Sequence, residues 1–236
     1  GRDGPYGDSY VIVTDGFTTG PFKKYATDHQ GSRTALVATI PGYDARSRPW
    51  YTSAVKRGKA SWSEVYVLFT GQDMAIAASL PVYDDRQNLL GVVAVDLFLS
   101  HINSFLQSIE IGKSGQGFIM ERSGRLVAAS SAEPVYIKPN EDNPPKRLHA
   151  GESGNRLIQA TAEFLTERFG DCRLIHGVQY LDFSIEGRRH FLQVSPIDDE
   201  YGLDWLIAVV IPEADFMAQI TTNNQSTALM IGCALA

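Results

Sequence analysis

The run SLPVYDDRQNLLGVVAVDL, residues 79–97, has a counterpart later in the chain in VSPIDDEYGLDWLIAVVIP, residues 194–212. Both contain a proline, an acidic turn and a final apolar strand, and they are displaced by about 115 residues. Apolar runs that flank a polar turn are typical of antiparallel strand pairs. The repeat therefore indicates that one module occurs twice in tandem.

The predicted elements around the first run are one helix and several strands. The helix runs from about Pro49 to Lys56, and Pro49 suits its first turn. The strands expected in this half are SYVIV (9–13), FKKYAT (22–27), RTALVATI (33–40, ended by Pro41 and Gly42), SEVYVLF (63–69), MAIAASLPVY (74–83) and LLGVVAVDLF (89–98).

The second half follows the same plan. Residues 100–110 space their apolar side chains at helical intervals after Ser100, a suitable N-cap. A hairpin at 117–130 and a polar loop at 131–145 precede a helix from Asn155 to Phe169, which Gly170 stops. The remaining strands are 178–186, 188–197 and 203–211. The fold class is therefore predicted to be α+β, with two tandem modules at 1–98 and 99–212, each an antiparallel sheet with flanking helices.

The two ends of the sequence suggest a piece of a longer membrane protein. The chain opens on a polar run without a signal peptide, which we interpret as the start of a fragment. A helix from Pro212 can continue into the apolar run ALMIGCALA (228–236), which is shorter than the ~20 residues of a spanning helix. We expect residues 213–236 to be an exit helix and the start of a transmembrane segment, with an amphipathic helix packed on the domain as the alternative.

Several classes of function find no support in the sequence. The net charge is −6 without a basic run, which argues against nucleic acid. The run GKSGQG (112–117) lacks the first glycine of a phosphate loop, because Gln107 stands there, and is interpreted as a turn. The five histidines show no metal or triad spacing, and Cys172 and Cys233 are expected to be unpaired. We predict no catalytic residue, no metal and no cofactor.

The run YDARSRPWYTSA (43–54) is the strongest candidate for a binding site. Arg48 precedes the predicted helix, and Trp50 and Tyr51 lie in its first turn. A helix N-terminus favours anions, and a guanidinium can hold a carboxylate through two hydrogen bonds. Aromatic side chains such as Tyr43 and Trp50 suit a small-molecule pocket. A plain helix start with a surface arginine would explain this stretch equally well.

Asp96 adds weight to the binding hypothesis. It follows the apolar strand LLGVVAV, where an unpaired buried carboxylate is expensive. The corresponding residue of the repeat is Ile211, so the module does not need an acid at this position. Asp96 is expected to hold a ligand ammonium or to pair with Arg48, and the structural alternatives are a strand-end cap or an internal salt bridge.

These residues, with WSEVY (62–66), GVVAVDL (91–97) and IGKSGQGFIMERSGRLVAAS (111–130), resemble the double Cache (dCache) sensor domains of bacterial transmembrane receptors, especially cyanobacterial sensor kinases and cyclases. The resemblance covers nearly the whole chain. It implies two PAS-like modules outside the cytoplasmic membrane, with the ligand in the membrane-distal one. It also implies an N-terminal helix and first strand that would precede this sequence.

The resemblance assigns roles to individual residues. In amino-acid-binding members, Arg48, Trp50 and Tyr51 match the positions around the carboxylate, and Tyr43, Tyr66 and Asp96 match those around the ammonium. Those members commonly carry an aspartate two residues after the Tyr66 position, where this chain has Leu68. A charge-assisted hydrogen bond is worth roughly 1.5–3 kcal/mol, so its loss would weaken an amino acid ~10- to 100-fold.

The prediction is thus a non-enzymatic, extracytoplasmic (periplasmic) sensor domain at the cell membrane that binds an amino acid or organic acid. The site comprises Tyr43, Arg48, Trp50, Tyr51, Tyr66, Leu68 and Asp96, and the second module is expected to bind no amino acid. Its partners would be the ligand, the membrane through the C-terminal helix, and a second copy in a homodimer, without nucleic acid. The alternatives are a structural or dimerising ectodomain and a sensor of an amine or purine.

Overall fold

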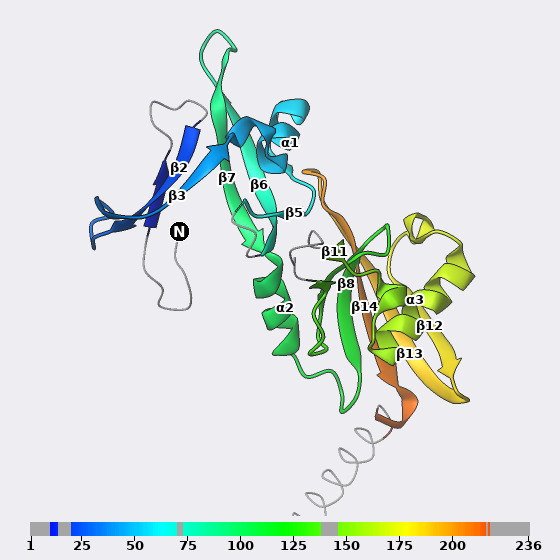
Figure 1. The fold of residues 1–236 in the computed structure, drawn as a ribbon. Coiled ribbons are helices and arrows are strands. Elements are labelled where there is room, and N and C mark those ends of the chain that lie inside the picture. Colours follow the sequence, from blue (N-terminus) through cyan, green and yellow to red (C-terminus); the bar gives the residue numbers. More distant parts are fainter. Residues whose placement is uncertain (1–9, 14–19, 70–72, 138–145, 216, 218–236) are drawn as a thin grey trace, which may run out of the picture. The chain divides into compact units, whose positions relative to one another are not determined.

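The computed structural model describes residues 10–13, 20–69, 73–137, 146–215 and 217 (Figure 1). The chain forms two compact units: the first comprises 1–64 and 78–95, and the second comprises 65–77 and 96–236. Antiparallel sheets and a few helices make up both, which confirms the predicted α+β class.

The first part of the chain builds a three-stranded sheet in the order β1 (Tyr10–Val13), β2 (Gly20–Thr27), β3 (Arg33–Tyr43). The expected strand end at Pro41 and Gly42 is wrong, because β3 continues to Tyr43. β3 is an edge strand in this sheet, where a proline without an N–H group is tolerated. Gly42 has φ +74°, a conformation that glycine adopts without steric cost.

A second sheet is built on β6 (Met74–Tyr83), which pairs with β7 (Leu89–Phe98) and with two short strands. These are β4 (Ser61–Trp62) and β5 (Tyr66–Val67), so the strand predicted at 63–69 is shorter than expected. The Ser63 hydroxyl donates to the Glu64 carbonyl at 2.8 Å, a local bond that competes with the ladder. Before β4 lie a 3₁₀ turn, η2 (Ala45–Ser47), and the predicted helix, α1 (Pro49–Arg57).

The second unit contains a five-stranded sheet with a helix against it. Its strand order is β12 (Gln179–Ile185), β13 (Arg188–Asp198), β14 (Asp204–Pro212), β8 (Gln116–Glu121), β9 (Leu126–Ala129). The helix α3 (Arg156–Phe169) packs on one sheet face and stops at Gly170, as predicted (Figure 1). Asn155, predicted as its first residue, is its N-cap. The core there includes Phe118, Ile158, Leu165, Leu192, Leu206 and Val210. The smaller elements are β10 (Tyr136–Ile137), β11 (Lys146–Arg147), η3 (Ala150–Glu152) and η4 (Cys172–Leu174).

The two repeated runs form hairpins that turn in the same way. In the β6–β7 turn, Asp84 Oδ1 accepts hydrogen bonds from the N–H groups of Arg86 and Asn88. In the β13–β14 turn, Asp199 Oδ1 accepts from the N–H groups two and four residues later, those of Tyr201 and Leu203. An aspartate that satisfies two turn amides fixes a hairpin, so the repeat extends to the turn chemistry.

The helix α2 (Leu99–Gln107) follows directly from β7, and its predicted limits at 100 and 110 need correction. Its N-cap is Phe98, which makes no side-chain capping bond, whereas Ser100 lies in the first turn and donates to Asp73. After β14 the chain is helical at Glu213–Asp215 and Met217, and most of the predicted exit segment lies outside the described residues. Within the described ranges no helix is long and apolar enough to span a membrane.

Candidate functional site

Arg48 lies at the start of α1, as predicted from the sequence. Its backbone is extended (φ −83°, ψ 145°), Pro49 is the first helical residue, and the Arg48 side chain makes no capping hydrogen bond. The unpaired N–H groups of a first turn and the helix dipole both favour a negative group. The Arg48 side chain is therefore attached to the chain at a helix N-terminus, whose backbone also favours an anion.

Arg46 is held in a different way, although it stands two residues earlier. Its Nε donates to Asp44 Oδ1 and its Nη2 to Asp44 Oδ2, both at 3.0 Å. These hydrogen bonds and the charge of Asp44 raise the pKa of Arg46. Because the fork of Arg46 already holds a carboxylate, the chain provides a matched comparison for Arg48.

Two aromatic side chains belong to the first turn of α1. Trp50 and Tyr51 are in edge-to-face contact, with ring centroids 5.7 Å apart and an interplanar angle of 71°. Tyr43 is the last residue of β3 and lies just before η2. Edge-to-face pairs keep aromatic rings in a fixed orientation, which suits a preformed pocket wall.

Tyr66 and Asp96 are brought together from strands 30 residues apart. The Tyr66 hydroxyl donates to Asp96 Oδ1 at 2.5 Å, and the Tyr66 side chain is 8% exposed. Asp96 was predicted to be buried, which is wrong: the residue is exposed. The prediction assumed that an apolar strand is buried, but β7 exposes even Val93 and Val95. Asp96 thus needs no ion pair to be tolerated.

Leu68 follows directly after β5 (Tyr66–Val67). Tyr66 pairs with Ala75 across the ladder, and the Leu68 N–H donates to the Asp73 carbonyl at 2.9 Å. Leu68 is half-buried. A carboxylate at this position would lie two residues along the chain from Tyr66, whose hydroxyl donates to Asp96.

The predicted site residues therefore fall into two groups, one in each compact unit. Tyr43, Arg48, Trp50 and Tyr51 belong to the first unit. Tyr66, Leu68 and Asp96 belong to the second unit. The structure shows the Trp50–Tyr51 contact in the first group and the Tyr66–Asp96 contact in the second. The use of both groups by one ligand stays a prediction.

The sequence analysis missed Asp73, which links three segments of the second unit. Its Oδ1 accepts from the Met74 N–H at 2.7 Å and from the Tyr136 hydroxyl at 3.4 Å, and its Oδ2 accepts from the Ser100 hydroxyl. Burial, and then the charge and hydrogen bond of Asp73, raise the pKa of Tyr136. The sequence signal was an acid at the end of the TGQD turn, directly before an apolar strand.

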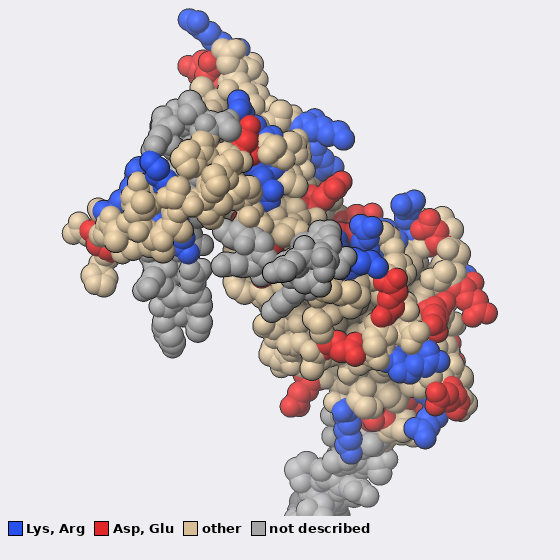
Figure 2. All heavy atoms as spheres, in the orientation of Figure 1, with Lys and Arg blue, Asp and Glu red and all other residues tan. Residues whose placement is uncertain are grey.

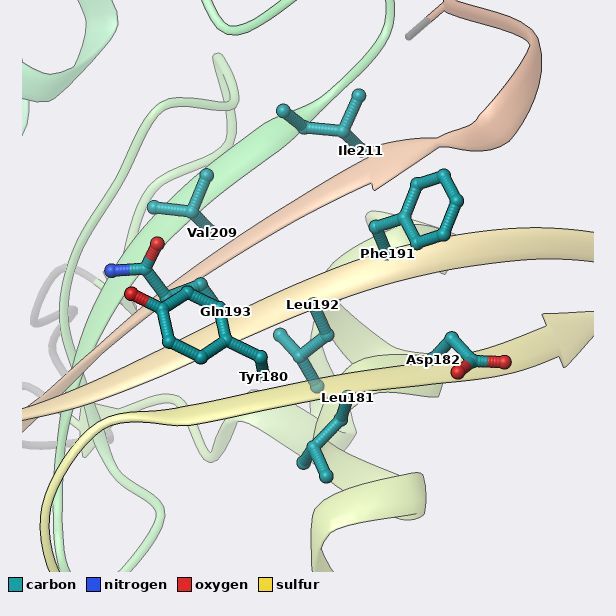
Figure 3. Close-up of a pocket in the computed structure, with 8 residues that line it drawn as sticks. All are labelled: Tyr180, Leu181, Asp182, Phe191, Leu192, Gln193, Val209 and Ile211. Carbon is teal, nitrogen blue, oxygen red and sulfur yellow. The ribbon is translucent and has the colours of Figure 1, made fainter. Parts of the chain in front are cut away.

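An apolar groove of about 450 Å³ lies on the face of the second-unit sheet opposite α3 (Figure 3). The side chains on this face include Tyr180, Phe191, Gln193, Val209 and Ile211, and Leu181 and Leu192 also line the groove. Its charged residue is Asp182, which forms an ion pair with Arg189 at 3.1 Å. Ile211, the counterpart of Asp96, thus belongs to an apolar surface.

Among the residues that the structure describes, the charge pattern and the acidic and sulfur side chains indicate no other kind of site. In the face shown in Figure 2, acidic and basic side chains of the second unit are interspersed. Within the part of the chain that the structure describes, no three His, Cys, Asp or Glu side chains gather as metal ligands. Cys172 is unpaired, and burial raises the pKa of its thiol.

Several curated proteins with similar sequences are methyl-accepting chemotaxis proteins. The chain is 24% identical over 196 residues to the methyl-accepting chemotaxis protein McpA of Pseudomonas putida, which covers 83% of this chain and 26% of McpA. It is 37% identical over 100 residues to McpC of Bacillus subtilis, which covers 42% of this chain and 15% of McpC. The chain therefore spans about a quarter of the length of McpA.

Solved structures show the same fold. The ligand-binding domain of the Pseudomonas fluorescens chemoreceptor CtaA in complex with L-isoleucine has a TM-score of 0.50 and 18% identity, and the match covers 82% of this chain and 69% of that one. The extracellular domain of mmHK1S-Z3 has a TM-score of 0.50 and 13% identity, and the match covers 90% of this chain and 75% of that one.

The family assignment rests on most of the chain. A family model described as Cache domain matches residues 7–220. The predicted resemblance is thereby confirmed, as is the prediction of a sensor-type domain rather than an enzyme. The chain belongs to the Cache domain family.

Proposed function

We propose that this chain is the extracytoplasmic ligand-sensing domain of a transmembrane receptor and that it binds a small carboxylate-bearing metabolite. The Cache family and the chemotaxis-receptor relatives support the sensing role. The observation that carries the carboxylate is the position of Arg48 as the N-cap residue of α1, directly before the first turn that contains Trp50 and Tyr51. A guanidinium and a helix N-terminus both favour an anion.

The ligand-binding residues in this proposal are those that the sequence identified. Arg48, Trp50 and Tyr51 receive the carboxylate. Tyr43, Tyr66 and Asp96 receive an ammonium, with Leu68 beside them. The contact between Tyr66 and Asp96 supports this role, because it holds an exposed carboxylate in one orientation. The complex of CtaA with L-isoleucine makes amino acids the first class to test.

The modules in this proposal are 1–98, which binds the ligand, and 99–212, which binds no amino acid. The apolar groove around Ile211 supports the expectation that the second module binds no amino acid. Arg189, beside the groove residue Asp182, forms ion pairs with Asp182 and Glu213. The segment 213–236 would lead to the membrane, and a homodimer would read the signal as motion between paired helices. Ligand binding would bias a two-state equilibrium of the domain.

A thermal-shift screen tests this function. The 236-residue chain is melted with amino acids, with organic acids, and with the same amino acids as carboxamides. A ligand that binds the folded state stabilises it by RT ln(1 + [L]/Kd), about 2.7 kcal/mol at a hundredfold excess over Kd. We expect at least one carboxylate to raise the melting temperature and its carboxamide to have no effect. If no carboxylate shifts the transition, or carboxamides act equally well, the proposal is wrong and a structural ectodomain or an amine sensor is favoured.

A further inference from the structure

The start of α2 is attached to the hairpin that carries Tyr66 and Leu68. The hydroxyl of Ser100, in the first turn of α2, donates to the carboxylate of Asp73. The backbone carbonyl of Asp73 accepts from the Leu68 N–H at 2.9 Å. One residue therefore connects the β5–β6 ladder, beside the proposed ligand residues, with the first turn of the helix.

The helix itself is fixed to the sheet of the second unit. Asn103 Oδ1 accepts from the Ala129 N–H at 2.9 Å, and Gln107 Nε2 donates to the Ser131 carbonyl at 2.8 Å. Leu99 and Leu106 are buried. A short helix held in this way transmits a displacement at one end and does not absorb it, because packed elements are stiff.

The loop after α2 is attached to the point where the chain leaves the sheet. Asp215 Oδ2 accepts from the Lys113 N–H at 2.9 Å, and from the Ser114 N–H and hydroxyl at 2.5 and 3.0 Å. Asp215 lies in the helical turn directly after β14, 101 residues beyond Ser114. Hydrogen bonds to a carboxylate are roughly twice as strong as those between neutral groups.

Two glycines give the loop the shape that this contact needs. Gly112 has φ +61°, and a Cβ there would lie 3.4 Å from Asp215 Oδ2. At Gly115 a Cβ would lie 2.4 Å from the Ile111 carbonyl oxygen, so a side chain has no room. Residues 112–114 of the run GKSGQG thus form a turn in which the Lys113 and Ser114 amides bind a carboxylate of the same chain.

The carboxylate of Asp215 is ionised at neutral pH. Partial desolvation raises the pKa of Asp215, but the hydrogen bonds from Ser114 and Lys113 and the charge of Lys113 lower it further than desolvation raises it. A folded-state pKa below the unfolded value means that the contribution is present above the unfolded pKa. It is lost as the pH falls through the folded pKa, so the contact persists across physiological pH.

We propose that α2 relays the ligand signal from the β5–β6 hairpin to the exit of the domain. A shift of the hairpin would move α2 through Asp73 and Ser100 and change the hold of Asp215 on Lys113 and Ser114. The relay rests on the proposed function, because it names how that site is read out. Asp73, Ser100 and Asp215 are positioning residues in this scheme.

Amide hydrogen exchange in the 236-residue chain tests the downstream contact first. Replacement of Asp215 by Ala removes the acceptor, and exchange at Lys113 and Ser114 should accelerate about 10- to 100-fold. The matched control is Glu213→Ala, on the same helical turn, whose carboxylate meets Arg189 at 3.5 Å. It should leave those two amides unchanged. Equal effects of the two variants would refute the contact.

The relay is tested by a change at the other end of α2. Ser100→Ala removes the hydroxyl bound to Asp73 and should accelerate exchange at Lys113 and Ser114 about 2- to 30-fold, the range of coupling between remote sites. The control is Ser104→Ala, an exposed serine of the same helix. The amide of Leu206, a buried residue of β14, reports global opening.

Acceleration at Lys113 and Ser114 by Ser100→Ala, greater than with Ser104→Ala and greater than at Leu206, supports the relay. The relay is wrong if Ser100→Ala leaves those amides unchanged, or changes them no more than Leu206. No ligand is added, so a failure of the relay and a failure of ligand binding are separate results.

Discussion

Leu68 determines how many carboxylates the proposed ammonium site contains. It follows β5 two residues after Tyr66, whose hydroxyl donates to Asp96. With a leucine at this position, Asp96 is the carboxylate that we assign to a ligand ammonium. The faces of Tyr43 and Tyr66 can add cation–π attraction. An apolar ligand body would contact Leu68 without cost.

Leu68→Asp tests this placement. A second carboxylate should strengthen amino-acid binding about 10-fold or more, because a hydrogen bond to a charged group contributes roughly 1.5–3 kcal/mol. The same change should weaken an organic acid that has no amine, through like-charge repulsion. Isothermal titration calorimetry with both ligand classes measures the two effects. Weaker amino-acid binding would show that Leu68 does not stand beside the ammonium.

Individual residues also show where sequence reasoning reaches its limit. The positions of Arg48, Trp50 and Tyr51 at the start of α1 were predicted correctly. Pro49, at the first helical position, marks this start in the local sequence. The contact of Tyr66 with Asp96 and the links made by Asp73 were not foreseen. They join segments 27 to 63 residues apart, and their partners depend on strand register and on the packing of α2.

The repeated hairpins were the most predictable elements, because apolar runs around an acidic turn carry their own signal. Asp84 and Asp199 perform the same turn chemistry in the two copies. The limits of β3, β5 and α2 were less predictable. They are set by an edge position, a serine bonded to its neighbour, and a helix cap without a polar side chain.

The β6–β7 turn contains a residue whose backbone strain a substitution can remove. Gln87 has φ +62°, where a side chain costs roughly 1–2 kcal/mol. After the entropic cost of glycine, Gln87→Gly should stabilise the chain by about 0.5–1 kcal/mol and raise the melting temperature by about 1–4 °C. Arg86→Gly, in the same turn at a residue without positive φ, is the control and should destabilise. A loss of stability with Gln87→Gly would argue against this turn geometry.

The cap of α3 offers a second test at the level of an element. Asn155 Oδ1 accepts from the N–H groups of Leu157 and Ile158 at 3.1 and 3.2 Å. Asn155→Ala should reduce the free energy of unfolding by about 1 kcal/mol, measured by urea denaturation. Asn155→Ser should retain most of the stability, because serine also caps helices. No difference between the two variants would mean that the side chain does not act as a cap.

At the scale of the whole molecule, the two repeated hairpins share one turn chemistry, but the two units carry different surfaces. The first unit presents Arg48 and its aromatic neighbours at a helix start. The second unit presents an apolar groove around Val209 and Ile211. We therefore expect one bound ligand per chain. Calorimetry should give a stoichiometry near one, and two equivalent carboxylate sites per chain would contradict the assignment.

The central claim is that Arg48 binds a ligand carboxylate, and a paired titration tests it most directly. The carboxylate with the largest thermal shift is titrated by calorimetry into the Arg48→Ala and Arg46→Ala variants. Loss of a charge-assisted bidentate contact should weaken binding at least ~10-fold for Arg48→Ala. Arg46→Ala should bind as the parent does, because Arg46 is held by Asp44. Unchanged affinity in Arg48→Ala, with both variants folded, would contradict the account.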